Sequence, residues 1–118
     1  MLYTNLKHIE KYADLLQAIH EYENVLVICG RMDPVCIPVF RIAEQLESKF
    51  SHVRFFDVES DNPESQMICS MTEVLSYTGL PLTIYYRNGQ IAKVTTDIHS
   101  KEQLVNFLEH ELALTAGN

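Results

Sequence analysis

A carboxylate and a thiol stand close together in the stretch Asp33-Pro34-Val35-Cys36. Asp is a preferred N-cap because its carboxylate accepts hydrogen bonds from free backbone amides, and Pro fits the first position of a helix. The pattern therefore predicts a helix that begins at about Pro34 and holds Cys36 in its first turn. A thiol in that position can become a reactive thiolate, because the helix dipole lowers its pKa. The Asp33 carboxylate opposes this change, so the alternative is that Cys36 is a small buried apolar residue.

The other cysteines and the histidines offer fewer options for chemistry. Cys29 could form a disulfide with Cys36 only if the two α-carbons came within ~7 Å. Cys69 lies among polar residues and methionines of an expected helix, which favours a packing role. The histidines lack a pair at metal-ligand spacing, so we expect no metal site; they are His8, His20, His52, His99 and His110. No phosphate loop or nucleophile elbow is present, and we expect no cofactor.

Two elements must position the Asp33 turn. Residues 25–29, VLVIC, form an apolar and mostly β-branched run that is typical of a strand covered on both faces. After the turn, the apolar positions recur at helical spacing. They are Val39, Ile42, Ala43, Leu46 and Phe50. Pro38 would remove a backbone hydrogen bond from a helix that begins at Pro34, so a kink or a later start is an alternative.

The remaining segments predict an alternation of strands and helices. Asn88-Gly89 favours a type I′ hairpin turn between two short strands. Ser100-Lys101-Glu102-Gln103 fits a capping box that opens the last helix. The other expected elements are a short edge strand at 6–9, a helix at 12–22, a strand at 53–58, a helix at about 64–75 and hairpin strands between 82 and 95. This order predicts an α/β fold.

The composition limits the classes of function. With 118 residues, 47% of them hydrophobic and 21% charged, residues 1–118 have the size and make-up of one globular domain. A formal charge of −7 and scattered Lys and Arg residues argue against nucleic-acid binding. No apolar run reaches membrane length, and charged residues interrupt the first twenty positions, where a secretory signal would need an apolar core. An odd number of cysteines, three, favours a reducing, cytoplasmic compartment.

Several details together resemble thioredoxin over about the whole chain. They are a VLV strand before a helix with a cysteine in its first turn, the run DVESDNP from Asp57, Gly79-Leu80-Pro81 before a strand, the Asn-Gly hairpin and the closing helix that opens with SKEQL. The resemblance implies a thioredoxin-like fold, with a central mixed β-sheet flanked by helices. It also implies that the peptide bond between Leu80 and Pro81 is cis and that Pro81 faces the turn.

The chain departs from the thioredoxin pattern at the residues that carry its chemistry. Asp33 replaces the nucleophilic first cysteine of the dithiol motif, so only the resolving cysteine, Cys36, remains. Exchange through a mixed disulfide needs a second thiol for release, so the chain is not expected to be a conventional dithiol-disulfide oxidoreductase. Supporting positions differ too. Val27 stands at the family's buried acid, Met32 and Cys29 at aromatic positions, and Asp97 at the glycine that lines the partner groove.

Two functions are consistent with these departures. In the first, Cys36 provides single-thiol redox chemistry by forming a mixed disulfide with a partner or with glutathione. In the second, the chain has lost redox chemistry and holds a protein partner in the groove. The resemblance places Met32, Leu80, Pro81 and Asp97 in that groove, beside the active-site turn of Met32, Asp33, Pro34 and Val35. A mixed apolar and acidic groove favours an extended peptide with apolar side chains and a basic residue. The accessibility of Cys36 separates the two hypotheses.

Overall fold

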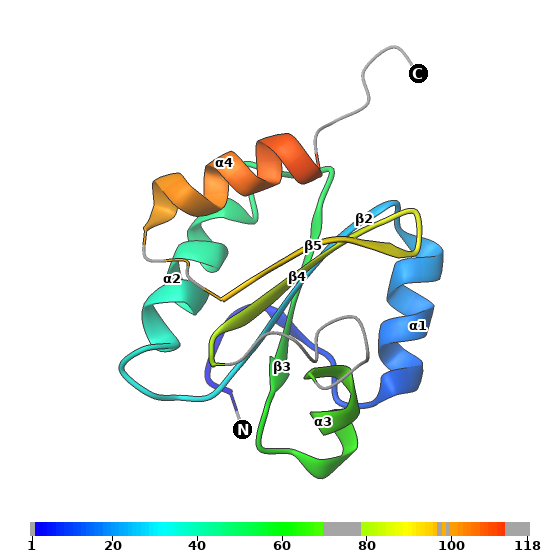
Figure 1. Cartoon of the computed structure of the whole chain (residues 1–118), viewed down its shortest axis with the longest axis vertical. Helices are drawn as coiled ribbons and strands as arrows, with labels where there is room; N and C mark the ends of the chain where they lie inside the picture. The colour runs from blue at the N-terminus through cyan, green and yellow to red at the C-terminus, as the bar shows by residue number, and fades with distance from the viewer. Residues whose placement is uncertain (1, 70–78, 97, 99, 113–118) are drawn as a thin grey trace.

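The computed structural model describes residues 2–69, 79–96, 98 and 100–112. Strands and helices alternate along the chain until a hairpin and a last helix complete it (Figure 1). The strands are β1 (Lys7–His8), β2 (Asn24–Gly30), β3 (Arg54–Glu59), β4 (Leu82–Arg87) and β5 (Gln90–Thr95). The helices are α1 (Tyr12–Glu21), α2 (Ile37–Leu46), α3 (Pro63–Cys69) and α4 (Lys101–Glu111). None of the helices in this part of the chain is long and apolar enough to cross a membrane.

The five strands form one mixed sheet in the order β1-β3-β2-β4-β5. The pairs β1–β3 and β2–β3 are parallel, whereas β2–β4 and β4–β5 are antiparallel. Helices α2 and α4 lie on one side of the sheet, and α1 and α3 lie on the other (Figure 1). The predicted α/β fold, a central mixed sheet flanked by helices, is confirmed. Strand β2 is central and every one of its residues is buried, as its continuous apolar run predicts.

Alternation along β2 divides the core into two clusters. Leu26 and Ile28 belong to the cluster that includes Phe40 and Leu104 of α2 and α4. Val25, Val27 and Cys29 belong to the cluster that includes Leu15 of α1 and Ile68 of α3. Successive side chains of a strand point to opposite faces, which explains this division. Because each fully buried aliphatic side chain contributes roughly 1.5–3 kcal/mol, β2 stabilises both layers at once.

The two strongest local signals give the structures that they predict. Asn88 and Gly89 have φ angles of 53° and 80°, and positive φ at both central residues is what a type I′ turn requires. Ser100 caps α4: its Oγ accepts from the Gln103 amide at 3.2 Å, and the Gln103 Oε1 accepts from the Ser100 amide at 3.2 Å. The predicted hairpin and capping box are both confirmed.

The entry into α2 differs from the first prediction. The helix begins at Ile37 and not at about Pro34, so the later start is correct. Pro38 gives the physical reason. Proline has no backbone N–H, and in the first two positions of a helix that N–H would have no partner within the helix. Pro38 therefore costs no hydrogen bond when the helix begins at Ile37. Cys36 becomes the residue that precedes the helix. The predicted helix at about 64–75 begins at Pro63 and is seen as far as Cys69, and positions 70–78 lie outside the described residues.

The capping box makes a testable contribution to stability. Replacing Ser100 with Ala removes an acceptor for a free amide at the start of α4, so Ser100→Ala should lower the free energy of unfolding by about 1 kcal/mol. The exposed Ser51 lies in a turn and makes a matched control, Ser51→Ala, which should change it by less than about 0.5 kcal/mol. Urea denaturation followed by circular dichroism measures both. Equal effects of the two substitutions would contradict the capping role.

Candidate functional site

Asp33 organises the turn between β2 and α2 with its side chain and its backbone. Its Oδ1 accepts hydrogen bonds from the amides of Val35 at 3.0 Å and Cys36 at 2.7 Å. Its carbonyl oxygen accepts from the Ile37 amide at 3.0 Å. The bond from the Cys36 amide is the main reason that the pKa of the Asp33 carboxyl lies below its usual value. Asp33 therefore keeps its negative charge and closes the turn that precedes the helix. The expectation that Asp33 is the N-cap of the helix is wrong, because α2 begins at Ile37 and Cys36 takes the N-cap position.

Cys36 is buried directly beneath this turn. The residue has no exposed surface and belongs to the core cluster on the α2 and α4 side of the sheet. Gly30 packs against it so closely that a β-carbon there would lie 3.1 Å from the Cys36 Sγ and 2.9 Å from the Phe40 Cζ. Burial raises the pKa of the Cys36 thiol, and the Asp33 carboxylate raises it further, although the Arg31 backbone opposes them. The thiol is held in its neutral, less nucleophilic form.

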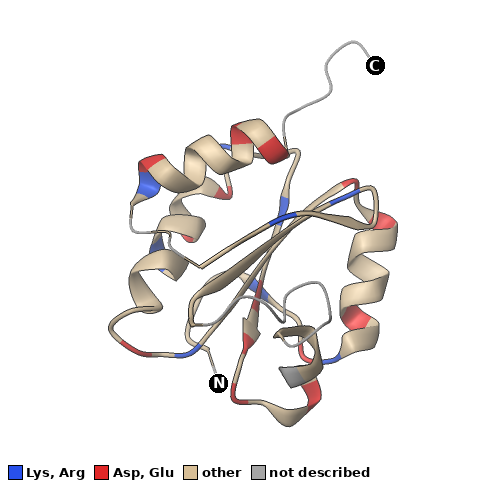
Figure 2. Ribbon diagram, viewed as in Figure 1, with Lys and Arg blue, Asp and Glu red and all other residues tan. Residues whose placement is uncertain are grey.

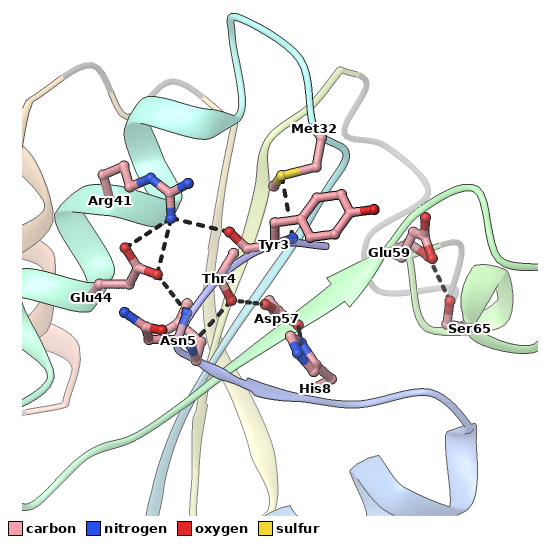
Figure 3. A network of polar contacts seen from close by, with 11 residues as sticks. Tyr3, Thr4, Asn5, His8, Met32, Arg41, Glu44, Asp57, Glu59 and Ser65 are labelled. Carbon is pink, nitrogen blue, oxygen red and sulfur yellow. Dashed lines mark hydrogen bonds and ion pairs between the residues drawn. The ribbon is translucent and has the colours of Figure 1, made fainter. Parts of the chain in front are cut away.

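The surface of the turn is largely apolar beside its two charged residues, Asp33 and the exposed Arg31. Val35 is 63% exposed, Pro34 is exposed, and Met32 is half-buried against the cluster that contains Cys36. The chain's N-terminal segment lies beside it (Figure 3). The Tyr3 amide donates to the Met32 Sδ at 3.4 Å, and Tyr3 is 72% exposed. An apolar surface is thus presented around Asp33 by two segments that are far apart in sequence.

An arginine of α2 holds that N-terminal segment in place. Arg41 Nη1 donates to the Tyr3 carbonyl at 3.2 Å and pairs with the Glu44 carboxylate at 3.1 Å. The same carboxylate accepts from the Asn5 amide at 2.6 Å. Together these contacts dock residues 3–5 onto α2 (Figure 3).

A buried acid on β3 is a polar feature that the sequence analysis missed. Asp57 has no exposed surface; its Oδ2 accepts from the Thr4 hydroxyl, and its Oδ1 lies 2.6 Å from the His8 Nδ1. Burial raises the pKa of Asp57, while the hydrogen bonds from Thr4 and His8 oppose that rise. The signal that could have found it is an acid inside the apolar run at residues 53–58. Asp57 pairs with Ile28 of β2. Ile28 directly follows Val27, which stands where the resemblance to thioredoxin places a buried acid.

The structure describes three of the four residues expected in the groove. Met32 and Leu80 are half-buried and pack against the cluster that contains Cys36, and Leu80 also reaches the other cluster. Pro81 is buried, and the peptide bond between Leu80 and Pro81 is cis. Asp97 lies outside the described residues.

The structure does not bring Cys29 and Cys36 together. Cys36 belongs to the cluster on the α2 and α4 side of the sheet, and Cys29 belongs to the cluster on the α1 and α3 side. The different clusters of the two thiols argue against the Cys29–Cys36 disulfide that the sequence left open. Across the described ranges, no three His, Cys, Asp or Glu side chains converge in a way that could hold a metal ion.

Comparison with known proteins identifies the fold. No protein-family model and no curated protein sequence matches the chain. A mutant thioredoxin from Halobacterium salinarum has a TM-score of 0.78 at 14% identity, covering 98% of this chain and 99% of that one. Thioredoxin f2 of Chlamydomonas reinhardtii has a TM-score of 0.76 at 15% identity, with 94% and 100% covered. A thioredoxin from Plasmodium falciparum has a TM-score of 0.74 at 18% identity, with 88% and 97% covered. The chain has the thioredoxin fold, which confirms the resemblance at the level of structure.

The lowered pKa of Asp33 predicts how stability depends on pH. A carboxyl whose pKa is lower in the folded state stabilises the fold above its unfolded pKa of about 3.9, and this contribution is lost as pH falls through the folded value. Asp33→Ala should therefore be less stable than the natural chain at pH 7, and the gap should narrow below about pH 4. Asp33→Asn keeps an acceptor for the amides and controls for capping alone. Chemical denaturation between pH 2 and pH 7 measures the gap, and a gap that does not change with pH would contradict this role.

Proposed function

We propose that this chain is a divergent thioredoxin-family protein that binds a protein partner and does not carry out thiol chemistry at its active-site turn. The observation that carries the proposal is the complete burial of Cys36 beneath an Asp33 that replaces the nucleophilic cysteine. Attack on a disulfide requires a thiolate that the other sulfur can reach. Cys36 has no exposed surface, which keeps another sulfur from reaching it, and burial and the Asp33 carboxylate raise its pKa, which disfavours the thiolate. This favours the binding module over the single-thiol hypothesis.

The exposed side chains around the turn support a binding role. Among the described residues, the exposed large apolar side chains are Tyr3, Leu16, Val35 and Met67. Two of these four, Tyr3 and Val35, lie at the turn, where Pro34 adds further exposed apolar surface. Apolar side chains grouped on a surface are typical of protein-binding sites.

The charge at the turn indicates the chemistry of the partner. Asp33 keeps its charge at neutral pH because backbone amides stabilise the carboxylate, and the chain as a whole carries −7. Acidic and basic residues occur together on the same elements, as on α2 and α4 (Figure 2). The partner that fits is an extended peptide segment with apolar side chains for Val35 and Met32 and a Lys or Arg for Asp33.

Selection from a library of random linear peptides tests this proposal under reducing conditions. The peptides recovered on the immobilised chain should combine apolar residues with Lys or Arg. Val35→Ala removes two exposed carbons at the turn and should weaken binding roughly tenfold, since each buried carbon is worth about 0.8 kcal/mol. Leu16→Ala is the matched control, because Leu16 is 45% exposed on α1, on the other side of the sheet.

A second variant separates binding from single-thiol chemistry. Cys36→Ala removes the thiol and should leave peptide affinity within about twofold, because the thiol is not at the surface. Fluorescence anisotropy with a selected peptide measures affinity for all three variants. Loss of binding in a folded Cys36→Ala variant, or selection of cysteine-containing peptides alone, would contradict the binding role and favour the single-thiol function. Equal effects of Val35→Ala and Leu16→Ala would show that the peptide binds elsewhere.

A further inference from the structure

Cys29 lies at the end of β2 that meets the start of α3. It pairs with Val58 of β3, and its neighbour Gly30 pairs with Glu59. The Ser60 amide donates to the Gly30 carbonyl at 2.9 Å, so the chain leaving β3 stays beside the end of β2. Cys29 itself has no exposed surface and points to the face covered by α1 and α3.

Helix α3 is anchored to this same corner of the sheet. The Ser65 hydroxyl donates to the Glu59 carbonyl at 2.6 Å (Figure 3). Ile68, one turn further along, has no exposed surface and packs in the cluster that contains Cys29. Cys69 follows, half-buried, and packs against the same cluster. The Cys29 thiol therefore lies inside the core and the Cys69 thiol at its edge, on β2 and α3, which pack in the same cluster.

The two thiols are neighbours within this cluster, because both side chains pack in it. The nearby Cys69 thiol is the largest cause of a Cys29 pKa well above its usual value, and burial adds to it. A disulfide between them requires the two sulfurs to approach to ~2.05 Å.

We propose that Cys29 and Cys69 form an oxidisable pair, a disulfide site between β2 and α3 that reacts with low-molecular-weight disulfides such as glutathione disulfide. This chemistry is separate from the turn and does not depend on the peptide-binding role. The half-exposed Cys69 is the point of entry, and the buried Cys29 is the resolving thiol.

The reaction balances in two exchange steps. The Cys69 thiol loses its proton, and the thiolate attacks one sulfur of the small disulfide; the Cys69 Sγ bonds to that sulfur and the first small thiol leaves. The Cys29 thiol then loses its proton and attacks the Cys69 Sγ, which releases the second small thiol. Two protein thiols are oxidised to one disulfide, and one small disulfide is reduced to two thiols. The second step should be slow at neutral pH and faster at higher pH, because the raised pKa of Cys29 keeps its thiol protonated.

Peptide mapping of the full chain tests this site. The reduced protein is incubated at pH 8 with glutathione disulfide, unreacted thiols are blocked with iodoacetamide, and the protein is digested with trypsin without reduction. Cleavage at Lys and Arg places the cysteines on separate peptides, 12–31 for Cys29, 32–41 for Cys36 and 55–87 for Cys69. The expected product joins peptides 12–31 and 55–87, with the mass of two hydrogens lost.

Two variants test which cysteines form the cross-link. Cys36→Ala should form the same cross-linked product at the same rate. Cys29→Val, which keeps an apolar side chain in the core, should leave Cys69 with one bound glutathione and no cross-link. Persistence of a glutathione mixed disulfide on Cys69 of the natural chain, without the cross-link, would overturn the proposal, and so would a cross-link that contains peptide 32–41. The measurement on the natural chain stands even if Cys29→Val fails to fold.

Discussion

The structure around the turn depends on the Asp33 carboxylate, which accepts the amides of Val35 and Cys36. Free amides at the start of a helix stabilise whichever negative charge is nearest. In this chain that charge belongs to a carboxylate, which is ionised at neutral pH without assistance. The interaction closes the turn before α2 and holds the backbone of Cys36, whose side chain is buried in the core. The same interaction that orders the site therefore removes the electrostatic help that a thiol would need in order to ionise.

Strand β2, which leads into the turn, contributes side chains to both layers of the core. Because its side chains alternate, it contributes Leu26 and Ile28 to the layer that buries Cys36, and Cys29 to the opposite layer. The sheet thus isolates Cys36 from the other two cysteines, whereas Cys29 and Cys69 share one corner beside α3. Any thiol chemistry of the folded chain is therefore expected away from the turn, and the turn is left with a charged, partly apolar surface.

The elements with local determinants were predictable from the sequence. The φ angles at Asn88 and Gly89, the capping box at Ser100 and the buried β2 each depend on a few adjacent residues. The start of α2 was harder to predict because Asp33, Pro34 and Pro38 give competing helix signals. In the structure Pro38 lies within the first two helical positions, which fits the later start. The buried acid Asp57 was missed because its partners, Thr4 and His8, come from a segment about fifty residues away. The packing of Cys29 and Cys69 in one cluster is likewise tertiary, and spacing in the chain gives no sign of it.

Asp33 and the packing beneath it keep Cys36 from reacting. The most direct measurement is the rate at which iodoacetamide modifies peptide 32–41 in the folded chain at pH 8, compared with the rate in urea. Because modification requires local opening of the turn, we predict that Cys36 reacts at least ~100-fold more slowly in the folded state. A rate in the folded state within about tenfold of the rate in urea would mean that the thiol is accessible, and would contradict this account of the site.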